Sequence, residues 1–397
     1  MVNFYGCGNM VLPLEGIRVL DLTWLLPYTT ILADFGAEVI KVEEPTRGDY
    51  SRWMPPLIKG QGAYFLSIHR NKKSITLNLK TEKGKEIFYK LAEKSDVVIE
   101  SFRPGVTKRL GVDYETIKKI NPKIVYCSVS GYGQDGPYKD LPGHDINYIA
   151  IGGILGLTGQ YGGPPIIPGI QIADLAGGCM LATISILIAL IAREKTGKGQ
   201  YIDVSMTDGA VSLLTHTSAL YFAEGKPPER GGTNLTGYFP CYNVYEAKDG
   251  KYISIGCFEE RFWRNLCKAI GKEEFAEHQW DTNKREEIFS TLKKIFKTKT
   301  RDEWFKELSK MDVCVGPVYS VDEVFQDPQI THRKMAVEIE HPTIGKIKIL
   351  GIPIKFSETP GKIRTPAPGF GEHTEEILKM LGYNQKEIEE FKKSGVI

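Results

Sequence analysis

The sequence has no marked excess of charge of either sign and few cysteines. Its 51 lysines and arginines nearly balance 49 aspartates and glutamates, for a net charge of +2. This balance argues against a nucleic-acid-binding protein, which needs a strongly basic face. The seven cysteines form no C-x-x-C pair, and an odd number with this spacing fits neither a disulfide framework nor a zinc site. We therefore expect a cytoplasmic protein without a bound metal.

The sequence also contains little that would direct the chain into a membrane. Residues 1–12 carry no basic region followed by an apolar core, and the last residues do not form a peroxisomal tripeptide. The longest uncharged run, from Leu175 to Ala192, approaches the ~20 apolar residues of a bilayer span. Paired glycines, Thr183 and Ser185 interrupt it. We interpret this run as a buried helix and expect no membrane span.

Common catalytic and nucleotide-binding motifs are missing. There is no G-x-x-x-x-G-K-[ST], no H-E-x-x-H and no G-x-S-x-G, the signatures of P-loop NTPases, zinc proteases and α/β-hydrolases. Gly131 to Gly136 fits G-x-G-x-x-G after a predicted strand. However, Pro137 follows and Pro142 comes soon after, so the loop does not open the helix that would hold a dinucleotide phosphate. We interpret this match as coincidence and expect no bound redox cofactor.

Strand and helix patterns alternate through the first half of the chain. Strands are predicted at residues 17–22, 38–43, 74–79, 97–100, 123–129 and 201–205. Helical patterns separate them; the clearest covers residues 83–94, with Ile87 and Leu91 one turn apart. This alternation is typical of a parallel sheet with crossover helices. We therefore expect an α/β fold with a large Rossmann-like domain.

The composition changes after this region and indicates further domains. We expect the large domain to cover residues 1–200, followed by a linker helix and loop at 201–230 that is rich in glycine, proline and charge. Residues 231–330 begin with a predicted hairpin and continue with short helices, which indicates a smaller α+β domain. Residues 331–397 form a fourth segment of strands and a final helix.

Two stretches thirty positions apart carry the most suggestive chemistry. Each places one titratable side chain, His144 or Asp174, beside glycines at a break in an apolar pattern. Histidine titrates near neutral pH without help from its surroundings. Asp174 precedes an apolar helix, whose positive dipole end and free N–H groups suit an anion. Together the two groups could exchange a proton with an acidic carbon beside a thioester.

Seven motifs, in order, resemble the fingerprints of the class III coenzyme A transferase family. They are LEGIRVLDL at 14–22, GAEVIKVE at 36–43, NKKSI at 71–75, ESFRPG at 100–105, SGYGQDGP at 130–137, TGKGQ at 196–200 and GEHT at 371–374. The resemblance implies a large Rossmann-like domain to which residues 331–397 return, and a small domain between. It also implies a homodimer in which the two chains interlock as rings.

Within this family, residues 142–148 resemble the α-methylacyl-CoA racemase branch. That resemblance implies that His144 and Asp174 are the acid and base, and that Glu259 hydrogen-bonds the histidine and orients it. We therefore expect a racemase of 2-methyl-branched acyl-CoA thioesters that works by 1,1-proton transfer at the α-carbon. Coenzyme A would be part of the substrate, with no permanently bound cofactor.

Two alternatives remain open at this point. In the transferase branch of the family, the carboxylate at the position of Asp174 is a nucleophile that forms an acyl anhydride and then a CoA thioester. Leu26 and residues 237–241 depart from the glutamine and the glycine-rich loop of formyl-CoA transferase, which weakens an oxalate-type transferase interpretation. The other alternative is a non-catalytic acyl-CoA-binding protein, which would need no acid and base.

The resemblance also implies a set of residues that hold coenzyme A. They are Leu25, Leu77, Ser101, Phe102, Arg103 and Arg109, with Asp145 near the pantetheine. Glu44 stands where formyl-CoA transferase has a phosphate-binding arginine, and we expect Arg47 to take over this contact.

Overall fold

The computed structural model describes residues 11–397, and the chain forms two compact units within it. The large unit contains the chain up to Gly152, together with Ile170–Leu213 and Pro328–Ile397. The small unit contains Gly153–Gly169 and Leu214–Asp327. Cys7 and most of the stretch in which no signal peptide is expected lie outside the described residues.

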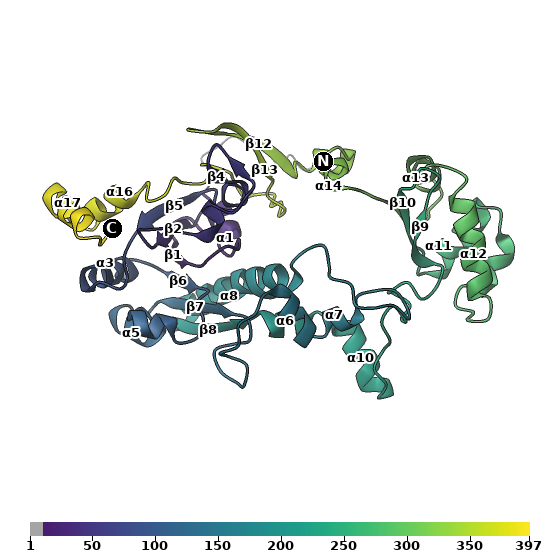
Figure 1. The fold of residues 1–397 in the computed structure, drawn as a ribbon, viewed down its shortest axis with the longest axis horizontal. Coiled ribbons are helices and arrows are strands. Elements are labelled where there is room, and N and C mark those ends of the chain that lie inside the picture. The colour runs from purple at the N-terminus through teal and green to yellow at the C-terminus, as the bar shows by residue number, and fades with distance from the viewer. Residues whose placement is uncertain (1–10) are drawn as a thin grey trace. The chain divides into compact units, whose positions relative to one another are not determined.

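The large unit is built on a six-stranded parallel sheet (Figure 1). Its strands are β1 (Arg18–Leu22), β2 (Glu38–Glu43), β5 (Lys72–Thr76), β6 (Val97–Glu100), β7 (Val125–Ser130) and β8 (Gln200–Ser205). They lie in the order β5-β2-β1-β6-β7-β8, and every neighbouring pair is parallel. The predicted α/β class with a large parallel sheet is confirmed. The chain order reverses between β1 and β6, so their carboxyl ends flank the switch point of the sheet.

Helices cover the sheet because alternate strand residues are apolar on each face. On one face, Leu20, Ile40 and Val98 share a buried core with α3 (Glu82–Glu93), α5 (Tyr114–Ile120) and two C-terminal helices, α16 (Thr374–Met380) and α17 (Gln385–Lys393). The side chain of Thr81 accepts a hydrogen bond from the backbone N–H of Gly84 and caps α3. Residues far apart in the sequence therefore stabilise one core.

The remaining elements of the large unit surround this sheet. They are α1 (Thr30–Asp34), η1 (Tyr50–Arg52), β3 (Leu57–Ile58), β4 (Gln61–Gly62), α2 (Ala63–Ile68), α4 (Val106–Leu110), α6 (Asp145–Ile151), η2 (Ala173–Met180), α8 (Leu181–Thr196), α9 (Met206–Ser212), α15 (Pro328–His332), β12 (Ala336–His341) and β13 (Gly345–Leu350). β12 and β13 pair as an antiparallel hairpin whose inner face packs on Phe65 and Leu66 of α2.

The apolar run singled out in the sequence forms η2 and α8, a continuous helix from Ala173 to Thr196. Within residues 11–397 it is the one helix that is long and apolar enough to cross a bilayer, judged by length and composition alone. The expectation that it is buried holds only in part, because one face leaves Ile184, Ile188 and Ile191 exposed. Its opposite face packs against β7 and β8.

The small unit combines a three-stranded antiparallel sheet with short helices. The sheet has the order β11 (Val315–Val318), β10 (Tyr252–Gly256), β9 (Tyr242–Glu246). The helices are α7 (Ile154–Leu157), α10 (Thr215–Glu224), α11 (Glu260–Ala269), η3 (Glu273–His278), α12 (Arg285–Phe296), α13 (Arg301–Leu308) and α14 (Val321–Val324). Buried Trp263, Phe296 and Trp304 fill its core.

The boundaries between the two compact units fall at other residues than the expected domain boundaries. The segment Gly153–Gly169 joins the small unit, and the chain stays in the large unit through β8 and α9. The boundaries 1–200, 201–230, 231–330 and 331–397 stay a prediction about domains.

Candidate active site

The carboxyl ends of four parallel strands surround a cavity of about 990 Å³ in the large unit. Leu22 ends β1, Glu43 ends β2, Leu77 follows β5 and Phe102 follows β6, and all four line this cavity. Ligands of open α/β sheets bind at this edge, outside the carboxyl ends of the strands near the switch point. The cavity is therefore the candidate binding site for an elongated ligand.

Four of the residues predicted to hold coenzyme A line this cavity: Arg47, Leu77, Phe102 and Arg109. Leu25, Ser101, Arg103 and Asp145 are not among the lining residues. Ser101 nevertheless contacts a lining residue, because its Oγ accepts a hydrogen bond of 3.0 Å from the backbone N–H of Trp24.

Sequence reasoning missed several other residues of the cavity. Tyr50 and Trp53 supply aromatic surface beside Trp24, and Lys80 adds a third basic side chain to Arg47 and Arg109. Aromatic rings offer faces on which a nucleobase can stack, and basic side chains attract phosphates. Nothing in the local pattern around residues 50–53 distinguishes a cavity wall from a surface turn.

Asp174 is the second residue of η2, a π-helical segment that leads into α8. Its backbone N–H donates a hydrogen bond of 3.0 Å to Oδ1 of the buried Asp145. Burial and the negative charge of Asp145 raise the pKa of Asp174 to about 6, and the charge of His144 offsets part of this rise. At neutral pH the Asp174 carboxylate is ionised and more basic than that of an ordinary aspartate.

Glycines allow η2 to lie directly against α9. A Cβ atom added to Gly209 would lie 2.3 Å from the Cα of Gly177, and one added to Gly177 would lie 2.7 Å from the carbonyl oxygen of Met206. Real Cβ atoms do not approach so closely, so only glycine allows this contact between backbones. π-Helical turns occur often at functional sites. The contact fixes the segment that carries Asp174.

His144 immediately precedes α6, and its backbone N–H donates to Oδ1 of Asn147 at 3.1 Å. Its side chain is exposed. Tyr148 fastens this loop, because its Oη donates to the carbonyl oxygen of Gly143 and its ring packs where a Cβ on Gly131 or Gly143 would clash. The structure thus brings His144 into electrostatic reach of Asp174.

Glu259, the third predicted catalytic residue, lies in the small unit, where it precedes α11. Its proposed role in orienting His144 stays a prediction.

Three tyrosines near Asp174 escaped the sequence analysis: Tyr28, Tyr64 and Tyr148. Burial, followed by the influence of Cys179 and Asp174, raises the pKa of Tyr64 to about 12 and the pKa of Tyr28 well above its ordinary value. Burial, followed by Asp174, raises the pKa of Tyr148 to about 12. All three hydroxyls remain protonated at neutral pH. Tyr148 already donates to Gly143 and Tyr28 is only 1% exposed, so the half-buried Tyr64 is the candidate donor to an oxyanion.

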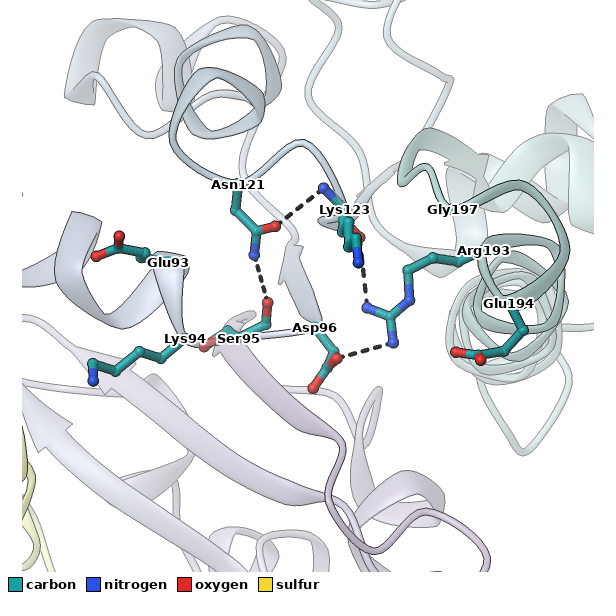
Figure 2. A pocket seen from close by; sticks show the side chains of 9 residues that line it. All are labelled: Glu93, Lys94, Ser95, Asp96, Asn121, Lys123, Arg193, Glu194 and Gly197. Atoms are coloured by element: carbon teal, nitrogen blue, oxygen red, sulfur yellow. Dashed lines mark hydrogen bonds and ion pairs between the residues drawn. The ribbon is translucent and has the colours of Figure 1, made fainter.

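A second cavity, of about 520 Å³, lies before the first residues of β6 and β7 and therefore at the opposite edge of the sheet (Figure 2). Arg193 pairs with Asp96 at 2.9 Å, and the Asn121 amide donates to the carbonyl oxygen of Ser95 at 2.8 Å. These polar groups satisfy one another, so they tie α8 and the loop before β7 to the start of β6. Throughout residues 11–397, no group of three histidines, cysteines or carboxylates is placed to hold a metal ion.

Comparisons with known proteins agree on the family and on the fold. The model of CoA-transferase family III matches residues 14–374. Succinyl-CoA:glutarate CoA-transferase of Homo sapiens is 38% identical over 400 residues, covering 98% of this chain and 91% of that protein. Acetyl-CoA:oxalate CoA-transferase of Acetobacter aceti is 38% identical over 355 residues, covering 87% and 89%. The crystal structure of a CAIB/BAIF family protein from Brucella suis matches with a TM-score of 0.82 at 35% identity, covering 93% and 99%.

The prediction of a 2-methylacyl-CoA racemase is wrong, since these similar proteins are named CoA-transferases. It was based on His144 and Asp174, but a carboxylate held near a thioester serves an acyl-transfer reaction as well as a proton transfer. Residues near such a carboxylate therefore do not distinguish the two reactions.

Proposed function

The chain belongs to CoA-transferase family III, and we propose that it moves coenzyme A between carboxylic acids through a covalent intermediate on Asp174. The observation that carries this proposal is the state of Asp174. Its carboxyl is half-buried, has a pKa raised to about 6 and lies within electrostatic reach of the protonated Tyr64. An ionised carboxylate in such a setting is suited to attack a thioester.

Four displacements complete the reaction. The Asp174 carboxylate attacks the acyl carbon of the donor thioester, the C–S bond breaks, and coenzyme A leaves as a thiolate, so that a mixed anhydride remains. The thiolate attacks the Asp174 carbonyl carbon and releases the donor acid as a carboxylate, which leaves a CoA thioester on Asp174. The acceptor carboxylate then attacks this thioester, its C–S bond breaks, and a second mixed anhydride remains. The released thiolate attacks the acyl carbon of the acceptor, which forms the new acyl-CoA and releases Asp174 as a free carboxylate. One negative charge is carried through every step, so no proton has to be transferred.

The raised pKa of Asp174 assists the first displacement. A carboxylate that is more basic than usual is a stronger nucleophile, while a pKa of about 6 still leaves it ionised at neutral pH. Burial therefore increases the reactivity of the group without removing its charge.

A surrounding donor stabilises the charge that develops on the attacked carbonyl oxygen. Tyr64 is the candidate donor, because it is half-buried and the negative charge of Asp174 contributes to the rise of its pKa. His144, when protonated, would attract the carboxylate of the incoming acid. The coenzyme would lie in the large cavity, with its phosphates near Arg47 and Arg109.

The names of the similar proteins support short dicarboxylic acids as substrates. One is named for succinyl-CoA and glutarate and another for acetyl-CoA and oxalate. We therefore propose succinyl-CoA as donor and a dicarboxylate as acceptor. The interlocked homodimer expected from the family resemblance is also a proposal. It is supported by the exposed aliphatic face of α8, which a second chain would cover.

The test is a transfer assay with purified protein, succinyl-CoA and a panel of acids that includes glutarate, oxalate, malate and acetate. The proposal predicts new acyl-CoA and ping-pong kinetics with at least one dicarboxylate, and no transfer by Asp174→Ala. Absence of transfer to every acid, with exchange of the substrate α-proton against solvent instead, would contradict it.

A further inference from the structure

Leu25 has a backbone conformation that is unfavourable for a leucine. Its φ angle is +68°, in the left-handed region that bulky side chains rarely adopt. Trp24, which lines the large cavity, directly precedes Leu25. Tyr28, whose pKa is raised in part by the charge of Asp174, follows three residues later. The turn at Leu25 therefore connects the proposed coenzyme site to the proposed nucleophile.

Asp49 is placed to hold Leu25 in this conformation. The backbone N–H of Leu25 points to both carboxylate oxygens of Asp49, at 3.4 and 3.3 Å. The same carboxylate accepts hydrogen bonds from the N–H and the hydroxyl of Ser51. Asp49 is only 2% exposed and pairs at 2.7 Å with Lys41, whose side chain is equally buried. A buried charge with this many partners has a fixed position.

The loop from Thr23 to Thr29 has two further buried anchors. Lys41 donates a second bond, of 2.8 Å, to the carbonyl oxygen of Thr23. Asp21 accepts hydrogen bonds from the hydroxyls of Thr23 and Thr29. The loop is thus fastened at its start and its end, and the bond from Leu25 to Asp49 fixes its middle.

Asp49 also binds a second aromatic residue that lines the cavity. Its carbonyl oxygen accepts a hydrogen bond of 3.0 Å from Nε1 of Trp53, and Tyr50 and Trp53 both line the cavity. One residue therefore joins the aromatic side chains of two separate loops.

We propose that Asp49 is a positioning residue, which holds Leu25 in the left-handed conformation and so keeps Trp24 in place on the wall of the cavity that would bind the CoA thioester. Asp49 touches neither the coenzyme nor the acyl group in this account and acts through Leu25. The inference rests on the proposed function, because it assumes that the cavity binds coenzyme A.

The first test changes Leu25 and leaves the buried charges intact. Leu25→Gly and Leu25→Ala both remove the side chain, but only glycine adopts a positive φ without strain. We expect the Kd for coenzyme A, measured by calorimetry, to be about 5- to 30-fold higher for Leu25→Ala than for Leu25→Gly. Equal Kd values for the two variants would overturn the proposal.

The second test is a double-mutant cycle. Asp49→Asn should raise the KM for succinyl-CoA and lower kcat, and in the Leu25→Gly background the same change should have a much smaller effect. The matched control is Asp34→Asn, which removes another buried carboxylate, one paired with Arg70 at 2.7 Å. It should lower the stability of the protein without changing KM. Equal effects of Asp49→Asn in both backgrounds would show that Asp49 does not act through Leu25.

Failure of CoA transfer and failure of the role of Asp49 give different experimental results. If the wild-type protein neither binds coenzyme A nor transfers it, the proposed function is wrong. If the wild type does both, but glycine at position 25 has no advantage over alanine, only the role of Asp49 is wrong. If Asp49→Asn does not fold, the comparison of Leu25→Gly with Leu25→Ala still tests the proposal.

Discussion

Asp174 must be ionised to act as a nucleophile, and burial together with Asp145 raises its pKa to about 6. Because this pKa is raised, a smaller fraction of Asp174 is ionised at acidic pH. We therefore predict that kcat/KM is constant above about pH 7 and falls tenfold for each pH unit well below 6. A pH–rate profile measured with succinyl-CoA checks this.

Asp145→Asn provides the control for this profile. The asparagine keeps an oxygen that can accept the hydrogen bond from the Asp174 N–H but removes the negative charge. The acid limb should then move to lower pH. An unchanged limb would show that Asp145 does not influence the group that titrates.

Glu100 makes stability depend on pH. Burial at the end of β6 raises its pKa to about 7, above the value of about 4.5 expected for an unfolded chain. A neutral Glu100 stabilises the folded protein relative to an ionised one. This stabilisation is complete below pH 4.5 and is lost as the pH rises through 7. Between pH 5 and pH 8, the free energy of unfolding should therefore rise by about 3 kcal/mol in Glu100→Gln relative to wild type. Urea unfolding of the two proteins at pH 5 and pH 8 measures the difference in their free energies of unfolding. An equal difference at the two pH values would contradict this prediction.

At the scale of single residues, chemistry that depends on one conspicuous side chain could be predicted. His144 and Asp174 stand beside glycines in otherwise apolar stretches, and the structure places them within electrostatic reach of each other. Tyr28 and Tyr64 could not be predicted, because a tyrosine in an apolar segment has the same pattern whether it fills a core or faces a site. Their proximity to Asp174 arises only when distant loops meet at the edge of the sheet.

At the scale of elements, the contact between η2 and α9 depends on glycines at positions 177 and 209. We predict that Gly209→Ala lowers the free energy of unfolding by about 1–3 kcal/mol, because its Cβ would overlap the backbone of Gly177. It should also lower kcat, since η2 carries Asp174. The control is Gly156→Ala, where an added Cβ meets no atom within 4 Å. Urea denaturation and transfer kinetics give the comparison; equal behaviour of the two variants would refute the role of this contact.

Elements with a strong pattern were predictable. Residues 38–43 and 97–100 form β2 and β6 with the predicted limits, because their valines and isoleucines are β-branched and favour strands. β11 was missed because a glycine and a proline occupy the middle of its four residues. The π-helical form of η2 has no sequence signal, since its apolar residues also fit an α-helix.

At the scale of the whole molecule, the exposed face of α8 predicts a dimer. Ile184, Ile188 and Ile191 are 49%, 61% and 60% exposed, and a soluble chain rarely leaves such a stripe uncovered. Sedimentation equilibrium should give twice the chain mass of 44.5 kDa. Ile188→Asp should shift the mass toward that of one chain. A wild-type protein of single-chain mass would contradict the proposed dimer.

The family could be predicted from motifs spread over the chain, whereas the reaction could not. The motifs lie in strands of the sheet, in its loops and in the C-terminal segment before α16, so they identify the family without identifying the reaction. The reaction depends on whether Asp174 removes a proton or attacks a carbonyl, which is decided by how the acyl group lies against it. Residues 142–148 therefore pointed to the wrong branch of the family.

The central claim is that Asp174 becomes covalently linked to coenzyme A during turnover. The direct measurement is mass spectrometry of the peptide that contains Asp174 after incubation with succinyl-CoA and quenching with hydroxylamine, which converts an activated aspartyl carbonyl into a hydroxamate. We predict a hydroxamate on Asp174 that requires succinyl-CoA and is absent from Asp174→Asn protein. Transfer at the full rate, with Asp174 unmodified, would contradict the account.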